Sequence, residues 1–186
     1  MELLSFFESV YKIAPDAGES LSSLITEKEY SKNEIIQQIG SRCRTIYIVK
    51  KGIARIFYHK DGLDITEHFA FDNDLIVRAE SLFTCEPTSK GIQAIEDTTV
   101  YAIDSFSLFS LYDQHHDIER LFRLLFEREH VNSIKRLESI QFQSAKDRYL
   151  ELLKNTDYIQ KIPLKHIASY LGITQVSLSR IRSEIR

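Results

Sequence analysis

Short apolar runs separated by turn residues dominate the chain between Glu34 and Ile103. These runs are rich in Ile, Val, Tyr, Phe and Thr, and read EIIQQIG, TIYIVKKG, IARIFYHKDG, ITEHFAF, GIQAIED and TVYAI. Within them, Lys60-Asp61-Gly62 supplies residues that accept the left-handed conformation of a tight hairpin. Regularly spaced short strands with no long helix between them predict an antiparallel barrel or sandwich over residues ~30–104.

The hydrophobic period becomes helical from Ser105, and no proline or glycine interrupts the chain from there to Ser144. A helix of ~27 residues would be ~40 Å long, which exceeds what the core of a small domain needs. Two interpretations follow: a long helix packed against the β domain, or a helix along which two copies of the chain pair. In the second interpretation, the predicted interface consists of Ile118, Leu121, Phe122, Leu125 and Phe126.

The last stretch, IPLKHIASYLGITQVSLSRIRSEIR, predicts two short helices joined by a turn. Pro163 suits the start of the first helix, and Gly172 can take the left-handed conformation that ends it. Thr174 then caps the second helix. The predicted inward positions are Leu164, Ile167, Ala168 and Leu171 in the first helix, and Val176 or Leu178 with Ile181 in the second. This is the pattern of a helix-turn-helix motif.

The composition fits an ordinary folded protein, because 43% of the 186 residues are apolar and 27% are charged. The net charge of -3 argues at first against a polyanionic partner. However, residues 1–110 hold 11 Lys and Arg against 17 Asp and Glu, whereas residues 135–186 hold 10 against 5. An acidic first part therefore hides a basic terminal region.

The excess of Lys and Arg around the helix-turn-helix motif favours nucleic-acid binding by this motif. The second helix would enter a major groove, where Gln175 suits an adenine edge and Arg180 a guanine edge. The predicted DNA-contacting residues are Thr174, Gln175, Val176, Ser177, Ser179, Arg180 and Lys165. The alternative interpretation of the same residues is an ordinary helical hairpin with a solvated charged face.

Catalysis and bound metal are not expected. Cys43 and Cys85 are too few for a disulfide framework or a cysteine-only metal site, and His115-His116 point ~100° apart on a helix. No glycine-rich phosphate loop, nucleophile elbow or zinc signature occurs, so no catalytic residues are assigned. The N-terminus lacks the features of a secretory signal, and no apolar run approaches ~20 residues. We therefore expect a cytoplasmic protein.

Three segments in order, GSRCRTIYIVKKGIARIF, the long helix and IASYLGITQVSLSRIR, resemble the Crp/Fnr family of bacterial transcription regulators over almost the whole chain. The resemblance implies an α+β fold with an N-terminal antiparallel β-roll, a cyclic-nucleotide-binding-like jelly roll, as effector domain (1–110). A long dimerisation helix (111–140) and a C-terminal winged-helix or helix-turn-helix module (141–186) would follow. Residues 154–163 are the candidate for an abbreviated wing. The implied partners are a second copy of the chain, palindromic double-stranded DNA and RNA polymerase.

The sequence departs from this family where a cyclic nucleotide would bind. Nucleotide-binding members carry Gly-Glu and then Arg-Ser or Arg-Thr, whereas the matching positions here are Arg78-Ala79 and Thr88-Ser89. A cyclic phosphate would lack its main charge partner, so we do not expect cyclic AMP to bind in the usual way. Arg78 and Glu80 nevertheless lie where that pocket would be, and they either form surface or structural ion pairs or bind a different, anionic effector. The candidate pocket residues are Arg78, Glu80, Ser81, Thr88 and Ser89.

The second helix of the motif also departs from the family. Members that recognise the best-known operator present Arg-Glu-x-x-x-Arg there, and only Arg180 of Gln175, Val176 and Arg180 matches. We therefore expect a different operator sequence. An effector, if one exists, would shift the arrangement of the DNA modules near residues 138–143. The alternative function is a ligand-sensing or protein-interaction module of the same fold without specific DNA binding.

Overall fold

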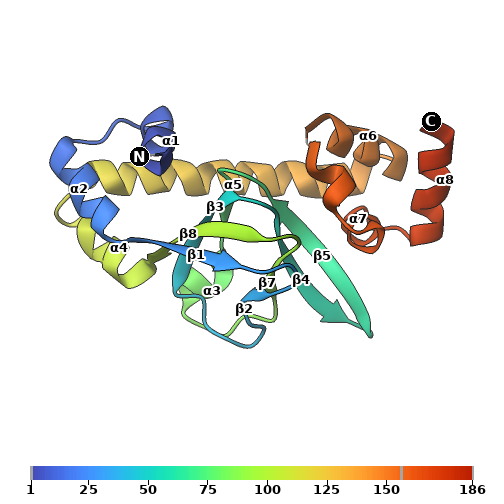
Figure 1. Cartoon of the computed structure of the whole chain (residues 1–186), viewed down its shortest axis with the longest axis horizontal. Coiled ribbons are helices and arrows are strands. Elements are labelled where there is room, and N and C mark those ends of the chain that lie inside the picture. Colours follow the sequence, from blue (N-terminus) through green and yellow to red (C-terminus); the bar gives the residue numbers. More distant parts are fainter. Residues whose placement is uncertain (1, 156, 186) are drawn as a thin grey trace.

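The computed structural model describes residues 2–155 and 157–185, and its β-roll consists of two four-stranded antiparallel sheets (Figure 1). The first sheet has the order β1 (Ile25–Tyr30), β8 (Thr98–Asp104), β3 (Thr45–Lys51), β6 (Leu75–Ile76). The second has the order β2 (Ile35–Gln37), β7 (Gly91–Ala94), β4 (Ala54–Lys60), β5 (Leu63–Ala70). This is the predicted antiparallel β domain, with its first strand starting at Ile25.

Alternation along β3 shows why both faces of the first sheet are covered. Successive side chains of a strand point to opposite faces. Tyr47 and Val49 lie in the core between the two sheets, whereas Ile46 and Ile48 lie in a second core with the N-terminal helices and the long helix. Because both faces of β3 are covered, its sequence is continuously apolar and does not alternate between apolar and polar residues.

The hairpin predicted at Lys60-Asp61-Gly62 is confirmed. Strands β4 and β5 pair from Ala54 opposite Ala70 to Lys60 opposite Leu63. Asp61 and Gly62 both have positive φ, at 51° and 76°, which is the backbone of a two-residue turn that matches strand twist.

Helices cover the outer face of the first sheet. They are α1 (Glu2–Val10), α2 (Pro15–Ser23), α4 (Ser105–Tyr112) and the long α5 (His116–Phe142), while α3 (Ala79–Thr84) follows β6. The helical period starting at Ser105 does not give one helix, because residues 113–115 break it. After this break, the Asp117 carboxylate accepts a hydrogen bond from the Ala14 backbone at 2.6 Å and fixes the start of α5 against the N-terminal segment.

The first half of α5 belongs to the core of its own chain, which corrects the predicted dimer interface. Ile118, Leu121 and Phe122 are fully buried, Leu125 is 2% exposed, and Phe126 packs partly buried against the same core. The physical reason is that α1, α2 and α4 already cover this stripe. The exposed apolar residues lie in the second half of the helix, and are Val131, Ile134, Leu137, Ile140 and Phe142.

The C-terminal module comprises α6 (Ala145–Asn155), a 3-10 helix η1 (Asp157–Lys161), α7 (Leu164–Tyr170) and α8 (Gln175–Ile185). Residues 154–155 and 157–161 are helical and form no strand pair, so the expectation of a wing there is wrong. A physical reason is that this segment packs against the β-roll. The Tyr158 hydroxyl donates to the Asp72 carboxylate, and the Lys161 ammonium donates to Glu96. Among the described residues, no helix is both long and apolar enough to span a membrane.

Candidate functional site

Helices α7 and α8 meet at the predicted glycine turn. Gly172 has φ of +68°, and the Thr174 hydroxyl accepts the Ser177 N–H at 3.1 Å. These observations confirm the left-handed turn and the helix cap. Of the two candidates for the inward position on α8, Leu178 is fully buried and Val176 is 63% exposed.

The outer face of α8 carries the predicted DNA-contacting residues. Thr174, Gln175, Val176, Ser179 and Arg180 are exposed, and Ser177 is half-buried. Lys165 lies exposed on α7. Figure 1 shows α8 at one end of the molecule, with no element covering its far side. This surface is thus open to a large partner.

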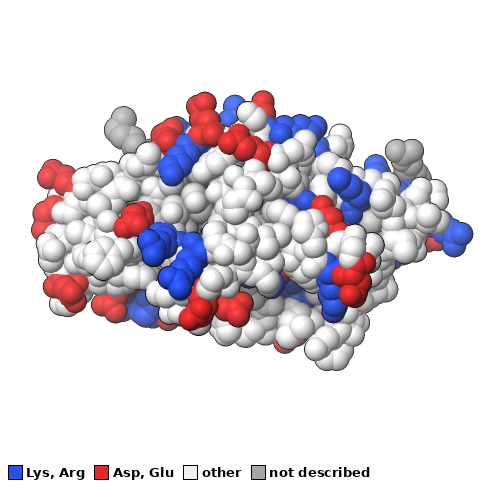
Figure 2. All heavy atoms as spheres, turned by 90° about the horizontal axis from the view of Figure 1, so that it is seen from below, with Lys and Arg blue, Asp and Glu red and all other residues white. Residues whose placement is uncertain are grey.

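Acidic and basic side chains are mixed over most of the molecule and differ mainly at its two ends. Figure 2 shows Asp and Glu along the end that carries α2 and α4, whereas Lys and Arg reach the opposite tip, where α8 lies. This arrangement matches the count of basic residues in the last part of the chain. Basic side chains at the α8 end would attract a polyanion to that end.

Helix α7 is docked on strand β5, which sequence reasoning missed. The Ser169 hydroxyl accepts the Thr66 N–H at 2.9 Å and donates to the Asp64 carbonyl at 3.2 Å. The rings of Phe69 and Tyr170 pack with centroids 5.1 Å apart. These partners lie more than one hundred positions apart in sequence, so no local pattern could have revealed them.

An ion pair between the buried Arg55 and the half-buried Asp64 lies beside this contact. Arg55 is 2% exposed and donates to both oxygens of Asp64, at 2.6 and 2.8 Å. Burial alone would raise the pKa of Asp64, but the hydrogen bonds and charge of Arg55 outweigh it, and the pKa is lowered. His166 of α7 is buried beside them. Burial, and then the charge of Arg55, lowers the pKa of His166 to about 4.

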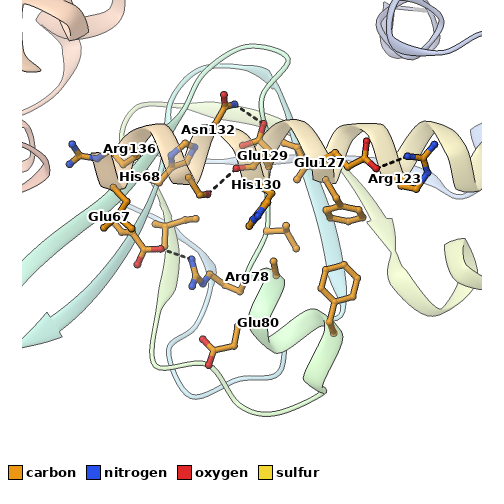
Figure 3. A pocket seen from close by; sticks show the side chains of 18 of the residues that line it. Glu67, His68, Arg78, Glu80, Arg123, Glu127, Glu129, His130, Asn132 and Arg136 are labelled. Atoms are coloured by element: carbon orange, nitrogen blue, oxygen red, sulfur yellow. Dashed lines mark hydrogen bonds and ion pairs between the residues drawn. The ribbon is translucent and has the colours of Figure 1, made fainter. Parts of the chain in front are cut away.

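A cavity of about 820 Å³ lies between the β-roll and α5 (Figure 3). Strand β5 contributes Glu67 and His68 to its wall, and the segment that opens α3 contributes Arg78 and Glu80. From α5, the residues that line it include Phe126, Glu129, His130, Asn132, Ser133, Arg136, Leu137 and Ile140. Its size is in the range of small-molecule sites.

Charged groups in this cavity are held close together. Nη1 of Arg78 lies 3.3 Å from Oε1 of Glu67, and Lys90 pairs with the other Glu67 oxygen. Burial alone would raise the pKa of Glu67, but Lys90 and Arg78 together lower it. Burial lowers the pKa of His68 to about 4. At neutral pH the wall thus presents an ionised Glu67 and an uncharged imidazole.

Only part of the predicted effector pocket faces this cavity. Arg78 and Glu80 line it, but Ser81, Thr88 and Ser89 do not. The buried Ser81 hydroxyl donates to the Glu86 carbonyl and accepts the Cys43 N–H. The Thr88 hydroxyl accepts the Lys90 N–H at 3.2 Å, and Ser89 is exposed. The sequence analysis did not select the residues of β5 and α5 that line the cavity. Their position among apolar residues was a signal that could have indicated them.

Comparisons with known proteins agree with this architecture. Residues 27–115 match the family model of the cyclic nucleotide-binding domain. A search among curated protein sequences returns no match.

The structure is similar to several solved ones. FixK2 from Bradyrhizobium japonicum has a TM-score of 0.75 and 22% identity, over 87% of this chain and 84% of that one. The c-di-GMP responsive global regulator CLP of Xanthomonas campestris has a TM-score of 0.70 and 12% identity, over 92% and 91%. The catabolite activator protein of Thermus thermophilus has a TM-score of 0.58 and 21% identity, over 94% and 84%. These similarities show a shared fold.

Proposed function

We propose that the chain is a cytoplasmic, homodimeric, sequence-specific DNA-binding transcription regulator of the Crp/Fnr type. The observation that carries this proposal is the pair α7–α8, in which a capped helix follows a left-handed glycine and turns its polar residues outward. In helix-turn-helix proteins the second helix lies in the major groove, with its N-terminal residues against base edges. The similarity in fold to regulators over most of the chain supports the same assignment.

The exposed side chains of α8 suit base and phosphate contacts. Gln175 can exchange two hydrogen bonds with an adenine edge, and Arg180 can donate two to a guanine. Val176 offers an apolar contact to a thymine methyl group. Thr174, Ser177, Ser179 and Lys165 would contact the phosphate backbone, which sets the position of the helix rather than its sequence preference.

Dimerisation is assigned to the second half of α5. Val131 and Ile134 are 47% and 45% exposed, and they lie three positions apart on one side of the helix. A sustained apolar strip on a long exposed helix is typical of pairing between copies. A twofold axis along this helix would direct the two α8 helices toward major grooves about 34 Å apart.

The cavity between the β-roll and α5 is proposed as an effector site. The matching family model implies a small-molecule effector. Cyclic AMP is not expected to bind in its usual way, because the positions of its phosphate partners are Thr88 and Ser89, which lie outside the cavity. An occupant would act only through its different affinities for two arrangements of the DNA module.

Selection of bound DNA from a random pool, with and without cyclic AMP, tests the proposal. Enrichment of palindromes whose half-sites are one helical turn apart is the expected result. Recovery of no preferred sequence would overturn it. That result would favour the second candidate, a ligand-sensing or protein-interaction module, for which the docking of α7 on β5 is the favouring observation.

A further inference from the structure

The helix-turn-helix module and the β-roll share one hydrophobic core. From the module this core contains Leu171 and Leu178, which are fully buried. From the β-roll it contains Ile53, Phe69 and Ile95, which are 0%, 4% and 1% exposed. The other buried members come from the module, and are Tyr149, Ile159, Ile162, Ile167 and Ala168. Moving the module away from the β-roll would expose apolar side chains on both, which is unfavourable in water.

Polar and aromatic contacts hold the module at a second place, the 3-10 helix η1. The Tyr158 hydroxyl donates to the Asp72 carboxylate at 2.6 Å, and the Tyr158 ring stacks on Phe71 with centroids 5.7 Å apart. The Lys161 ammonium lies 3.1 Å from the Glu96 carboxylate. Together with the hydrogen bonds between α7 and β5, these contacts attach the module at two separate points. It therefore cannot rotate about either point alone.

The joint between α5 and α6 is braced as well. The Ser144 hydroxyl accepts the Asp147 N–H at 3.1 Å and caps α6. Arg148 of α6 donates to the Gln143 carbonyl, at the end of α5, at 2.5 Å. It also donates to the Leu171 carbonyl, at the end of α7, at 2.7 Å. One side chain thus connects three helices across the joint, so the joint is not a free linker.

Docking uses a different face of the module from the one that is predicted to bind DNA. On α7, Ser169 and Tyr170 contact β5, and Ile167 is buried. On α8, Gln175 and Arg180 are exposed. Figure 1 shows α7 between β5 and α8. The docked arrangement therefore leaves α8 open, and a major groove can reach this helix without undocking of the module.

We propose that the β-roll is a rigid support for the helix-turn-helix module, and that the docked arrangement is the one that binds DNA with no effector bound. The inference rests on the proposed function, since it names the arrangement in which α8 reaches DNA. Its physical basis is that any second arrangement loses the shared core and the contacts at η1 and α7 together. The sign of regulation follows, because a ligand that favours another arrangement would weaken DNA binding.

Native-state hydrogen exchange of the whole chain, read by mass spectrometry, tests the rigid support without DNA. Ile53→Ala removes buried carbon atoms on the β-roll side of the shared core, and should speed exchange of the α7 amides at least about tenfold. Leu63→Ala, at an exposed position of β5, is the control and should leave this rate unchanged. If Ile53→Ala does not fold, Ile53→Val should give a smaller rise of about twofold or more. Unchanged α7 exchange in a folded Ile53 variant would overturn the proposal, because the module would then be stable by itself.

A covalent link across the interface tests whether the docked arrangement binds DNA. Lys161→Cys with Glu96→Cys replaces the ion pair at η1 by two thiols, and Cys85→Ser removes the exposed native thiol. A short bis-maleimide joins the two thiols, and N-ethylmaleimide blocks them separately in the matched control.

With no effector added, we expect the linked and the blocked protein to bind DNA selected by the unaltered chain with affinities within about threefold of each other. A loss of about tenfold or more on linking would show that DNA requires another arrangement, and would overturn the proposal. If the unaltered chain selects no DNA sequence, the proposed function fails and the assignment of a DNA-binding arrangement fails with it. Hydrogen exchange still decides separately whether the β-roll supports the module.

Discussion

The guanidinium of Arg136 lies over the Tyr170 ring, 3.8 Å from its centroid, and donates to the Tyr170 carbonyl. Arg148 of α6 donates to the next carbonyl, that of Leu171, at 2.7 Å. Two cations thus meet the C-terminal end of α7, where the helix presents unpaired carbonyls and the negative end of its dipole. Since Arg136 also lines the cavity, it connects the wall of the cavity with helix α7.

Replacing Arg136 by alanine should destabilise the docked module. The Tyr170 carbonyl loses a charged donor, and the ring loses its cation, so we expect the free energy of unfolding to fall by about 1.5–3 kcal/mol. Urea denaturation followed by circular dichroism measures this change. Lys135→Ala is the matched control, because Lys135 is the exposed neighbour on the same helix. Equal stability of both variants would contradict the role of Arg136.

Arg180→Ala should weaken specific DNA binding by about 1–3 kcal/mol and relax the preference at one base pair of each half-site. The cause is the loss of a two-nitrogen contact with a guanine edge. Competition binding with operator variants measures it. Arg120→Ala, on α5 beside Tyr11, is a control that should leave DNA binding unchanged. Unaltered discrimination in Arg180→Ala would remove its assigned role.

Lys165→Gln should weaken binding to all DNA sequences about equally. A phosphate contact carries no sequence information, and losing one should reduce the slope of log affinity against log salt by about 1. Lys146 and Lys161 are less suitable, since they pair with Glu184 and Glu96. Titration of binding against salt tests this, and an unchanged slope would place Lys165 away from the phosphates.

Charges at Val131 and Ile134 should separate the two copies. Val131→Glu with Ile134→Glu places two carboxylates in the proposed apolar contact, and light scattering should then show a monomer with its secondary structure retained. Lys135→Glu, at an exposed position of the same helix, is the control. In contrast, Leu121→Glu should prevent folding, because Leu121 is fully buried. A double variant that stays dimeric would show that another face pairs.

Features that depend on local backbone geometry could be predicted from the sequence. Asp61-Gly62 and Gly172 were recognised because few residues accept positive φ, and the structure has all three there. Likewise, Thr174 was recognised as a cap because its hydroxyl satisfies a backbone donor three residues away.

Features that depend on partners far apart in the sequence could not be predicted from it. The apolar stripe from Ile118 to Leu125 was visible, but periodicity does not say whether the same chain or a second copy covers it. The cavity combines Glu67 of β5 with Glu129 of α5, and Ser169 meets Thr66, over separations that no sequence pattern reports. The residues of α5 that are buried in the chain's own core and the residues that line the cavity therefore depend on contacts that the sequence does not report.

The burial of His166 in α7 predicts that stability falls in acid. His166 is 3% exposed and faces Arg55 of β4, Asp64 of β5 and Lys165 of its own helix. Its pKa is lowered to about 4, against about 6.5 in an unfolded chain. Between these values the unfolded chain binds a proton that the folded chain does not. The stabilising effect of the neutral imidazole is thus present above pH ~6.5 and is lost as the pH falls toward 4.

His166→Gln should therefore flatten the dependence of stability on pH. For the unaltered chain we expect the free energy of unfolding to fall by up to about 1.4 kcal/mol per pH unit from this group within that window. Denaturant unfolding at several pH values from 7 to 5 measures the slope, and the difference between the two proteins removes the contribution of the carboxylates and of His68. His59→Gln, at an exposed position, should keep the original slope. If His166→Gln keeps it too, the imidazole is charged in the folded chain, and α7 docking does not depend on its neutral form.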